Sequence, residues 1–208
     1  MEPWDAVRDE RLDLVERLAE LDDEQWNSPS LCELWRIRDV LAHLTAGAEG
    51  AFGVGAIFKG LLRHRFNHHR WVAADGQLRG QQDPEDILKA LRNAAANRRV
   101  LPGARPGTVL ADVLIHGQDI CRPLGIRRDL PRAHLVAVAD FIKDDRHIYG
   151  AKKRIAGVKL TATDMDWTHG HGPEVTGRAE ALVMMMAGRW VALDDLSGEG
   201  KASLAARR

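Results

Sequence analysis

The sequence is poor in cysteine, in aromatic residues and in long apolar runs. Of its 208 residues only two are cysteines, Cys32 and Cys121, and 5% are aromatic. Two cysteines cannot build the disulfide framework of a small secreted protein, so we expect free thiols and a cytoplasmic location. No apolar run approaches the ~20 residues that span a bilayer, and the first residues (MEPWD) lack the charged-then-apolar pattern of a signal peptide.

The chain has no excess of either charge. Lysine plus arginine equals aspartate plus glutamate, at 30 each. This balance gives no reason to expect nucleic acid or a membrane surface as a partner. A hydrophobic content of 45% is ordinary for a globular protein, and 208 residues suffice for one domain with an appendage or for two small domains.

Helical periodicity dominates the first part of the chain. Apolar residues recur at helical spacing over residues 4–21, and a second helix is predicted from Ile37 into the 60s. Residues 63–82 are polar, basic and rich in histidine, which indicates a loop or a weak helix. Asp83 and Pro84 mark a strong helix start, as a cap and a first helical residue. After a loop over residues 102–107, two more helices are expected, at about 108–125 and from 131. This series predicts an up-down bundle.

The pattern changes near residue 150. Residues 155–162 include β-branched side chains and alternate between apolar and polar positions, which is typical of a strand. A glycine-rich loop over 170–177 then precedes a short helix at 179–187. The tail from Leu193 is expected to add a last strand. The predicted fold class is therefore mainly α, with a helical bundle over residues 1–147 and a small α+β C-terminal domain over residues 151–208.

Three residues of the predicted bundle form a candidate metal site. Asp112 and His116 are four residues apart in a predicted helix, so their side chains lie on one face. If helices two and four face each other, His43 converges on the same point. Two histidines and one carboxylate bind zinc, nickel or iron and leave positions open for a ligand. The alternative is that His43 is a core histidine hydrogen-bonded to Asp112.

Two motifs connect these residues to a known family. Residues 28–44 read SPSLCELWRIRDVLAHL, which resembles the opening signature of the mycothiol-dependent maleylpyruvate isomerase family, one of the DinB-like metal-binding bundles. A second motif places an acid, Asp112, four residues before His116, followed by GQDI where the family shows H-x-x-D-(I/L). Pieces of the C-terminal part also match, namely VKLTATD at 158–164, AGR at 187–189 and LSGEG at 196–200. The resemblance covers nearly the whole chain.

The resemblance implies a DinB-like four-helix bundle whose metal, most readily zinc, is held by His43, Asp112 and His116. The family often has glutamate where this chain has Asp112. It also implies mycothiol or a similar low-molecular-weight thiol, bound as the nucleophilic thiolate that adds to a small electrophilic substrate. The reaction is then isomerisation or thiol transfer. Arg189 matches an arginine that the family places near the active site, and it could clamp a carboxylate. Asp119 is either an acceptor that orients an imidazole or a solvated helix residue.

Other readings stay open. A non-catalytic metal-binding scaffold or stress-related interaction protein would need no cleft, and a metal-dependent hydrolase would need a base, for which Asp119 is the candidate. A homodimer is compatible with the sequence. The remaining histidines, cysteines and tryptophans are expected to be solvated or to pack in the core: His64, His68, His69, His169 and His171 in loops, and Cys32, Cys121, Trp26 and Trp35 in the interior.

Overall fold

The computed structural model describes residues 2–100 and 105–208, with only the backbone of Ala56 and His69. The chain forms two compact units, residues 1–128 and 129–208, which are described separately. The helix predicted from residue 131 therefore belongs to the second unit by its contacts. The domain boundary expected at residues 147–151, where limited proteolysis should cleave the chain, stays a prediction. Part of the loop expected at 102–107 lies outside the described residues, and a helix begins at Pro106.

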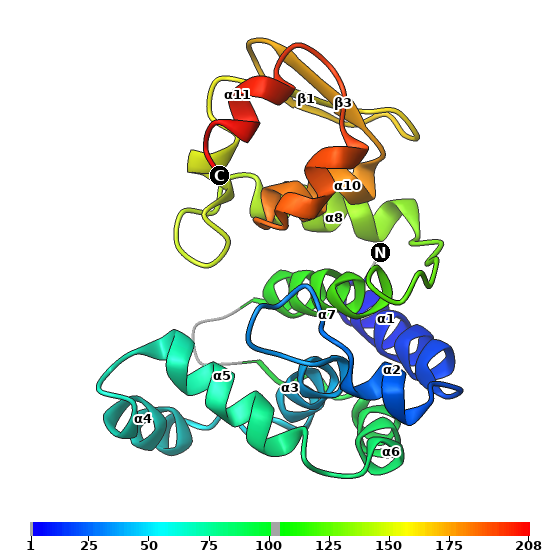
Figure 1. The fold of residues 1–208 in the computed structure, drawn as a ribbon, viewed down its shortest axis with the longest axis vertical. Helices are drawn as coiled ribbons and strands as arrows, with labels where there is room; N and C mark the ends of the chain where they lie inside the picture. The colour runs from blue at the N-terminus through cyan, green and yellow to red at the C-terminus, as the bar shows by residue number, and fades with distance from the viewer. Residues whose placement is uncertain (1, 101–104) are drawn as a thin grey trace. The chain divides into compact units, whose positions relative to one another are not determined.

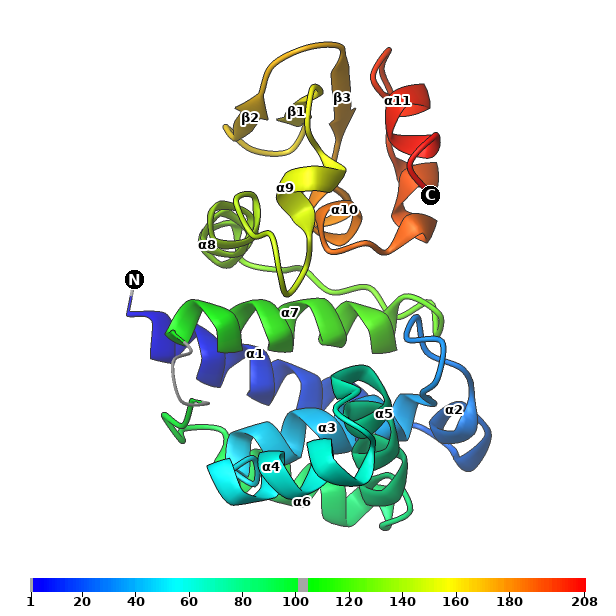
Figure 2. The same cartoon turned by 90° about the vertical axis from the view of Figure 1, so that its left-hand side faces the viewer.

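Four helices form the first unit's core: α1 (Pro3–Leu18), α3 (Ile37–Glu49), α6 (Pro84–Ala94) and α7 (Pro106–Cys121). Each packs against two others, since α1 contacts α6 and α7, and α3 contacts α6 and α7 (Figure 1). Figure 2 shows α7 beside α1. Their facing sides bury a continuous apolar core that includes Leu14, Leu41, Leu91, Val113 and Ile120. The predicted helical bundle is confirmed.

The described residues of the first unit also form three shorter helices: α2 (Asp23–Asn27), α4 (Val54–Arg63) and α5 (His68–Arg79). The helix predicted from Ile37 into the 60s, whose glycines allowed close packing or a break, is broken: α3 ends at Glu49. Gly50 follows it with a φ of 75°, a left-handed conformation that glycine adopts without strain. The weak-helix reading of residues 63–82 corresponds to α5, which packs against α3.

The helix starts follow the capping rules. Asp83 accepts a hydrogen bond from the backbone N–H of Glu85 at 2.9 Å and precedes Pro84, as predicted. At the start of α3, the buried Asp39 carboxylate reaches back to the backbone N–H of Arg36 at 3.0 Å. These caps set where α3 and α6 begin, and therefore where His43 lies along the bundle.

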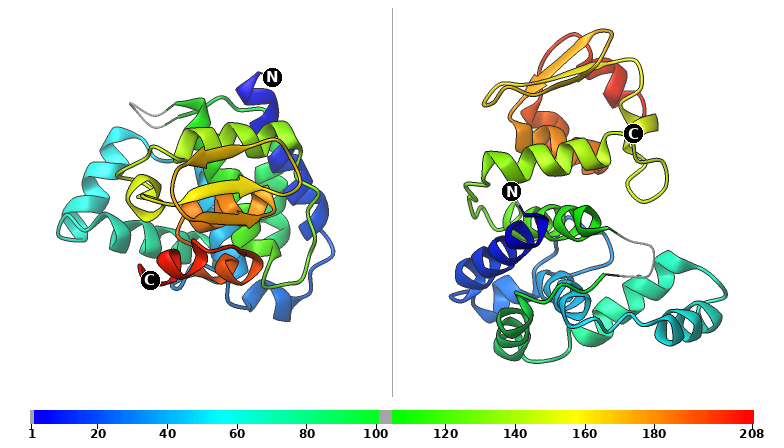
Figure 3. Two further views of the ribbon diagram at one scale, coloured as in Figure 1. Left: turned by 90° about the horizontal axis from the view of Figure 1, so that it is seen from above. Right: turned by 180° about the vertical axis from the view of Figure 1, so that it is seen from behind.

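The second unit contains α8 (Arg132–Ile142), α9 (Ala151–Arg154), α10 (Ala179–Met186), the 3₁₀ helix η1 (Trp190–Asp195) and α11 (Lys201–Ala205). Its sheet has the order β2-β1-β3, formed by Thr168–Gly170, Lys159–Ala162 and Glu174–Gly177. Strand β1 pairs antiparallel to β2 and parallel to β3. Helix α10 packs against β1, β3 and α8 (Figure 3). The last strand expected from Leu193 is wrong, since the tail is helical apart from one bridge between Thr176 and Ser197.

Within the described part of the chain, every helix falls short of the length and apolar character needed to cross a bilayer.

Candidate metal centre

A compact turn over residues 29–36, directly before α3, is hydrogen-bonded to α7. Pro29 bridges to Arg36, and the Ser30 hydroxyl donates to the carbonyl of Trp35 at 2.8 Å. The N–H of Leu31 donates to the carbonyl of Asp119 on α7 at 3.1 Å. The turn therefore positions the sequence motif that precedes His43 directly against the helix that carries the second motif.

Helix α7 places Asp112, His116 and Asp119 on one face, at helical spacing of four and three residues. His116 uses both ring nitrogens. Its Nε2 lies 3.5 Å from Asp112 Oδ1, and its Nδ1 lies 2.9 Å from Asp119 Oδ2. A hydrogen bond donated by Nδ1 to Asp119 leaves Nε2 with a free lone pair on the Asp112 side. This is the tautomer that a metal ligand needs.

His43 approaches the same point from α3, which packs against α7. Its Nε2 lies 3.9 Å from Asp112 Oδ2, which is too long for a hydrogen bond. Its Nδ1 is buried and has no hydrogen-bond partner among the described residues. The structure therefore does not support the alternative of a core histidine satisfied by Asp112.

The three donor groups fit a divalent ion. One nitrogen of each imidazole and one Asp112 oxygen lie within 4.8 Å of one another. Two ligands that are each 2.0–2.1 Å from a tetrahedral zinc ion are separated by about 3.4 Å. The observed gaps of 3.5 and 3.9 Å are close to this separation. The side chains are 15% exposed for both histidines and 38% for Asp112, so the cluster is reachable from solvent.

An aromatic shell surrounds the two histidines. The Trp35 ring lies 5.0 Å from the His43 ring and 5.8 Å from the His116 ring, between centroids. Phe52 lies 5.7 Å from His43 on another side. Trp35 approaches this closely because Gly76 on α5 has no side chain; a Cβ there would come within 2.7 Å of the indole. Trp35 closes the core as expected, and it also limits how the imidazoles can turn.

The two imidazoles differ in protonation. Burial lowers the pKa of His43 to about 4, and the neighbouring His116 adds to this effect against the opposing Asp112. Burial also lowers the pKa of His116, but the hydrogen bond to Asp119, together with Cys32 and Asp112, has a larger opposing effect. The net result is a pKa of His116 raised to about 10. At neutral pH, His43 is therefore ready to bind a cation, whereas His116 must release a proton first.

Cys32 lies beside the cluster, although the sequence favours a buried packing role for it over that of a nucleophile or soft ligand. Its Sγ donates to Asp119 Oδ2 at 3.1 Å and lies 3.6 Å from His116 Nδ1. Asp119 itself is fully buried and hydrogen-bonded to His116, so it is not a solvated helix residue. Cys32, His116 and Asp119 form a second group of potential metal ligands. The cysteine in the SPSLC motif was the available signal, but only the fold brings it next to a residue 87 positions away.

The other predicted residues lie on other elements of the two units. Arg189 is in the second unit, where its guanidinium donates to the Ala187 carbonyl at 3.0 Å and lowers the pKa of Arg154 by charge repulsion, in addition to the larger effect of burial. Its role as an anion clamp stays a prediction. His169 lies on β2, not in a loop, and Cys121 is fully buried. His64 follows α4, and His68 begins α5.

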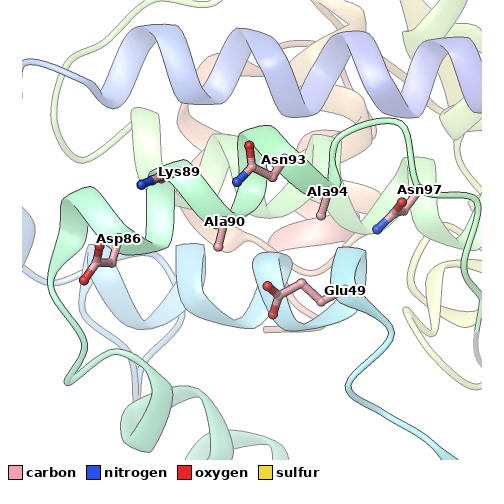
Figure 4. Close-up of a pocket in the computed structure, with 7 residues that line it drawn as sticks. All are labelled: Glu49, Asp86, Lys89, Ala90, Asn93, Ala94 and Asn97. Atoms are coloured by element: carbon pink, nitrogen blue, oxygen red, sulfur yellow. The ribbon is translucent and has the colours of Figure 1, made fainter.

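A separate hollow opens between α3 and α6 (Figure 4). It is lined by Glu49, Asp86, Lys89, Ala90, Asn93, Ala94 and Asn97. None of these residues belongs to the candidate metal centre, and its charges of both signs do not define a ligand. This hollow is therefore distinct from the candidate metal centre at His43 and α7.

Comparison with known proteins finds a family model that matches the first half of the chain. Residues 7–107 match the family model described as the mycothiol maleylpyruvate isomerase N-terminal domain. This match agrees with the resemblance to the mycothiol-dependent maleylpyruvate isomerase family that the motifs predicted, over the first half of the chain. His43 lies within the matched residues, whereas Asp112 and His116 follow them.

Two solved structures have the same fold. The chain is similar to the crystal structure of the mycothiol-dependent maleylpyruvate isomerase, with a TM-score of 0.65, 17% identity and coverage of 96% of this chain and 92% of that chain. A mutant of that enzyme matches with a TM-score of 0.63, 16% identity and the same coverage. This likeness confirms the DinB-like helical fold. No curated protein sequence matches the chain significantly.

Proposed function

We propose that this protein is a divalent-metal-dependent enzyme that adds a mycothiol-type thiol to a small electrophilic molecule. Elimination of the thiol after bond rotation gives net cis-trans isomerisation, whereas retention of the thiol gives transfer. The observation that carries the proposal is the convergence of His43, Asp112 and His116 from α3 and α7, at separations that suit one ion. The thiol and the electrophile class come from the resemblance of residues 7–107 to the N-terminal domain of mycothiol maleylpyruvate isomerase.

Each residue has a distinct part in this proposal. His43, Asp112 and His116 would hold the ion, which supplies a lowered thiol pKa and so a thiolate nucleophile at neutral pH. Two neutral imidazoles and one carboxylate suit zinc and leave room for a thiol. Asp119 keeps the proton of His116 on Nδ1, so that Nε2 stays directed at the ion. Arg189 would hold a carboxylate of the thiol or substrate by bidentate hydrogen bonds.

The structure weakens the hydrolase alternative. A metal-dependent hydrolase needs a base that can reach the attacking water. Asp119, the candidate base, is fully buried, and its Oδ2 already accepts hydrogen bonds from His116 and Cys32. We therefore assign Asp119 a positioning role, and we favour the thiol reaction over hydrolysis at this site.

Elemental analysis tests the metal part of the proposal. We expect close to one equivalent of zinc in the purified protein and a large loss in His116→Ala, because two protein ligands rarely hold a divalent ion against a chelator. His147→Ala, at an exposed histidine of the second unit, is the matched control and should keep its zinc. Full zinc content in His116→Ala would show that the ion binds elsewhere.

Thermal shift and turnover test the thiol part. Mycothiol should stabilise the zinc-loaded protein in a concentration-dependent way and leave the metal-free protein unchanged. The shift should shrink in Arg189→Ala and not in Arg146→Ala, an exposed arginine of the same unit. The zinc-loaded protein with mycothiol should convert maleylpyruvate to its trans isomer or form a thiol adduct. A bound metal without any response to thiol would favour the scaffold reading.

A further inference from the structure

Helix α4 carries a stripe of large apolar side chains that face solvent. Val54, Phe58 and Leu62 follow one another at four-residue spacing and are 67%, 61% and 57% exposed. Phe66, beyond the end of the helix, is 68% exposed. We call these four residues the α4 stripe. Single exposed apolar residues are common, but a contiguous row of this kind marks an interaction surface.

The stripe is not the face by which α4 packs on its own unit. That face is formed by Ile57, Gly60, Leu61 and His64, which are all half-buried. Gly60 is in close contact with Trp71 of α5, since a Cβ there would come within 2.1 Å of the indole. Helix α4 therefore contacts α5 through this half-buried face (Figure 2). The α4 stripe is a separate apolar surface of the same helix.

The segment around the stripe is strongly cationic. Residues 50–74 contain no aspartate or glutamate, although the chain has 30 acids in 208 residues, which would place three or four in a stretch of this length. The same segment holds four cations: Lys59, Arg63, Arg65 and Arg70. All four are exposed. The balanced charge of the whole chain, from which no membrane partner was expected, hides this local excess.

We propose that the α4 stripe and its four cations bind the surface of an anionic phospholipid bilayer. An amphipathic helix with phenylalanine and leucine on one side and Lys/Arg beside them lies in the bilayer interface, apolar side inward. The cations interact with anionic headgroups at short range. A second copy of this chain is a poorer partner, because pairing two α4 stripes would bring eight like charges together. This inference does not depend on the proposed function.

Co-sedimentation with vesicles tests the proposal. The full-length protein should sediment with phosphatidylcholine–phosphatidylglycerol vesicles at low salt, and not with phosphatidylcholine vesicles. Lys59→Glu/Arg63→Glu should weaken binding at least ~30-fold, since each cation near an anionic surface contributes about a fivefold factor. Lys89→Glu/Arg92→Glu on α6 makes the same charge change at similar spacing and should bind like the wild type.

A second pair of variants tests the apolar part. Phe58→Ser/Leu62→Ser should lower the affinity at least tenfold, whereas Leu78→Ser, at a residue 65% exposed on α5, should not. Circular dichroism and unfolding midpoints confirm that the variants fold. Failure of the wild type to bind anionic vesicles would overturn the proposal, as would equal losses in the control variants. Dimerisation that disappears in Phe58→Ser/Leu62→Ser would assign the stripe to a second copy instead.

Discussion

Asp119→Asn gives the sharpest test of how the candidate site works. The buried Asp119 carboxylate accepts a hydrogen bond from His116 Nδ1 at 2.9 Å, and it is the strongest of the effects that raise the pKa of His116 to about 10. The amide has nearly the same shape but no charge. It therefore removes the electrostatic part of the interaction without opening a cavity.

The carboxylate has two opposing effects on metal affinity. It makes the metal-bound imidazole a better ligand, and loss of such a partner typically weakens binding by about 10–100-fold. It also stabilises the protonated imidazole, which competes with the metal. Because the pKa of His116 is raised above its usual value of 6.5, the wild-type residue is protonated below about pH 10 and one proton must leave when metal binds. Zinc affinity of the wild type should thus rise about tenfold per pH unit between pH 6.5 and 9.

Chelator competition over this pH range separates the two effects. In Asp119→Asn the pKa of His116 falls, so the dependence of affinity on pH should flatten while the affinity at the alkaline end drops by about 10–100-fold. Asp9→Asn, at an exposed aspartate of α1, is the matched control and should follow the wild type. Identical affinities and slopes for wild type and Asp119→Asn would refute the reasoning that this carboxylate orients and charges His116.

Three further predictions concern the fold around the site. In the metal-free protein, the pKa of His43 is lowered to about 4, whereas the same side chain in the unfolded protein has a pKa near 6.5. The unfolded state therefore binds a proton between pH 6.5 and 4 that the folded state does not bind, and the free energy of unfolding should fall over this range. Denaturant titration should show a smaller fall in His43→Gln. Burial raises the pKa of Cys121 to about 11, so its thiol should be unreactive in the native protein, whereas half-buried Cys32 should react. Native protein should therefore consume one equivalent of a thiol reagent and denatured protein two. Two equivalents in the native state would contradict this. Gly76→Ala should lower the free energy of unfolding by about 1 kcal/mol, since the clash with the adjoining indole exceeds the gain in helix propensity, whereas Gly47→Ala, with open space around it, should raise it.

The sequence by itself determined what depends on local geometry. Helical periodicity and the Asp83–Pro84 start are local signals, and they predicted the bundle helices α1, α6 and α7, whereas they missed the end of α3 at Glu49. The spacing of Asp112, His116 and Asp119 follows from the pitch of one helix, so their common face needed no tertiary information. The motif around His43 and the family it indicates were also readable directly.

Only the tertiary structure decided what depends on packing between segments. The approach of His43 to Asp112 requires α3 to face α7, and the contact of Cys32 with Asp119 requires the turn before α3 to be tied to α7. The exposure of the α4 stripe was hidden as well, because an apolar helical pattern looks the same whether its face is buried or open to solvent. Periodicity specifies which residues share a face, whereas the partner of that face is set by the packing of elements far apart in the chain.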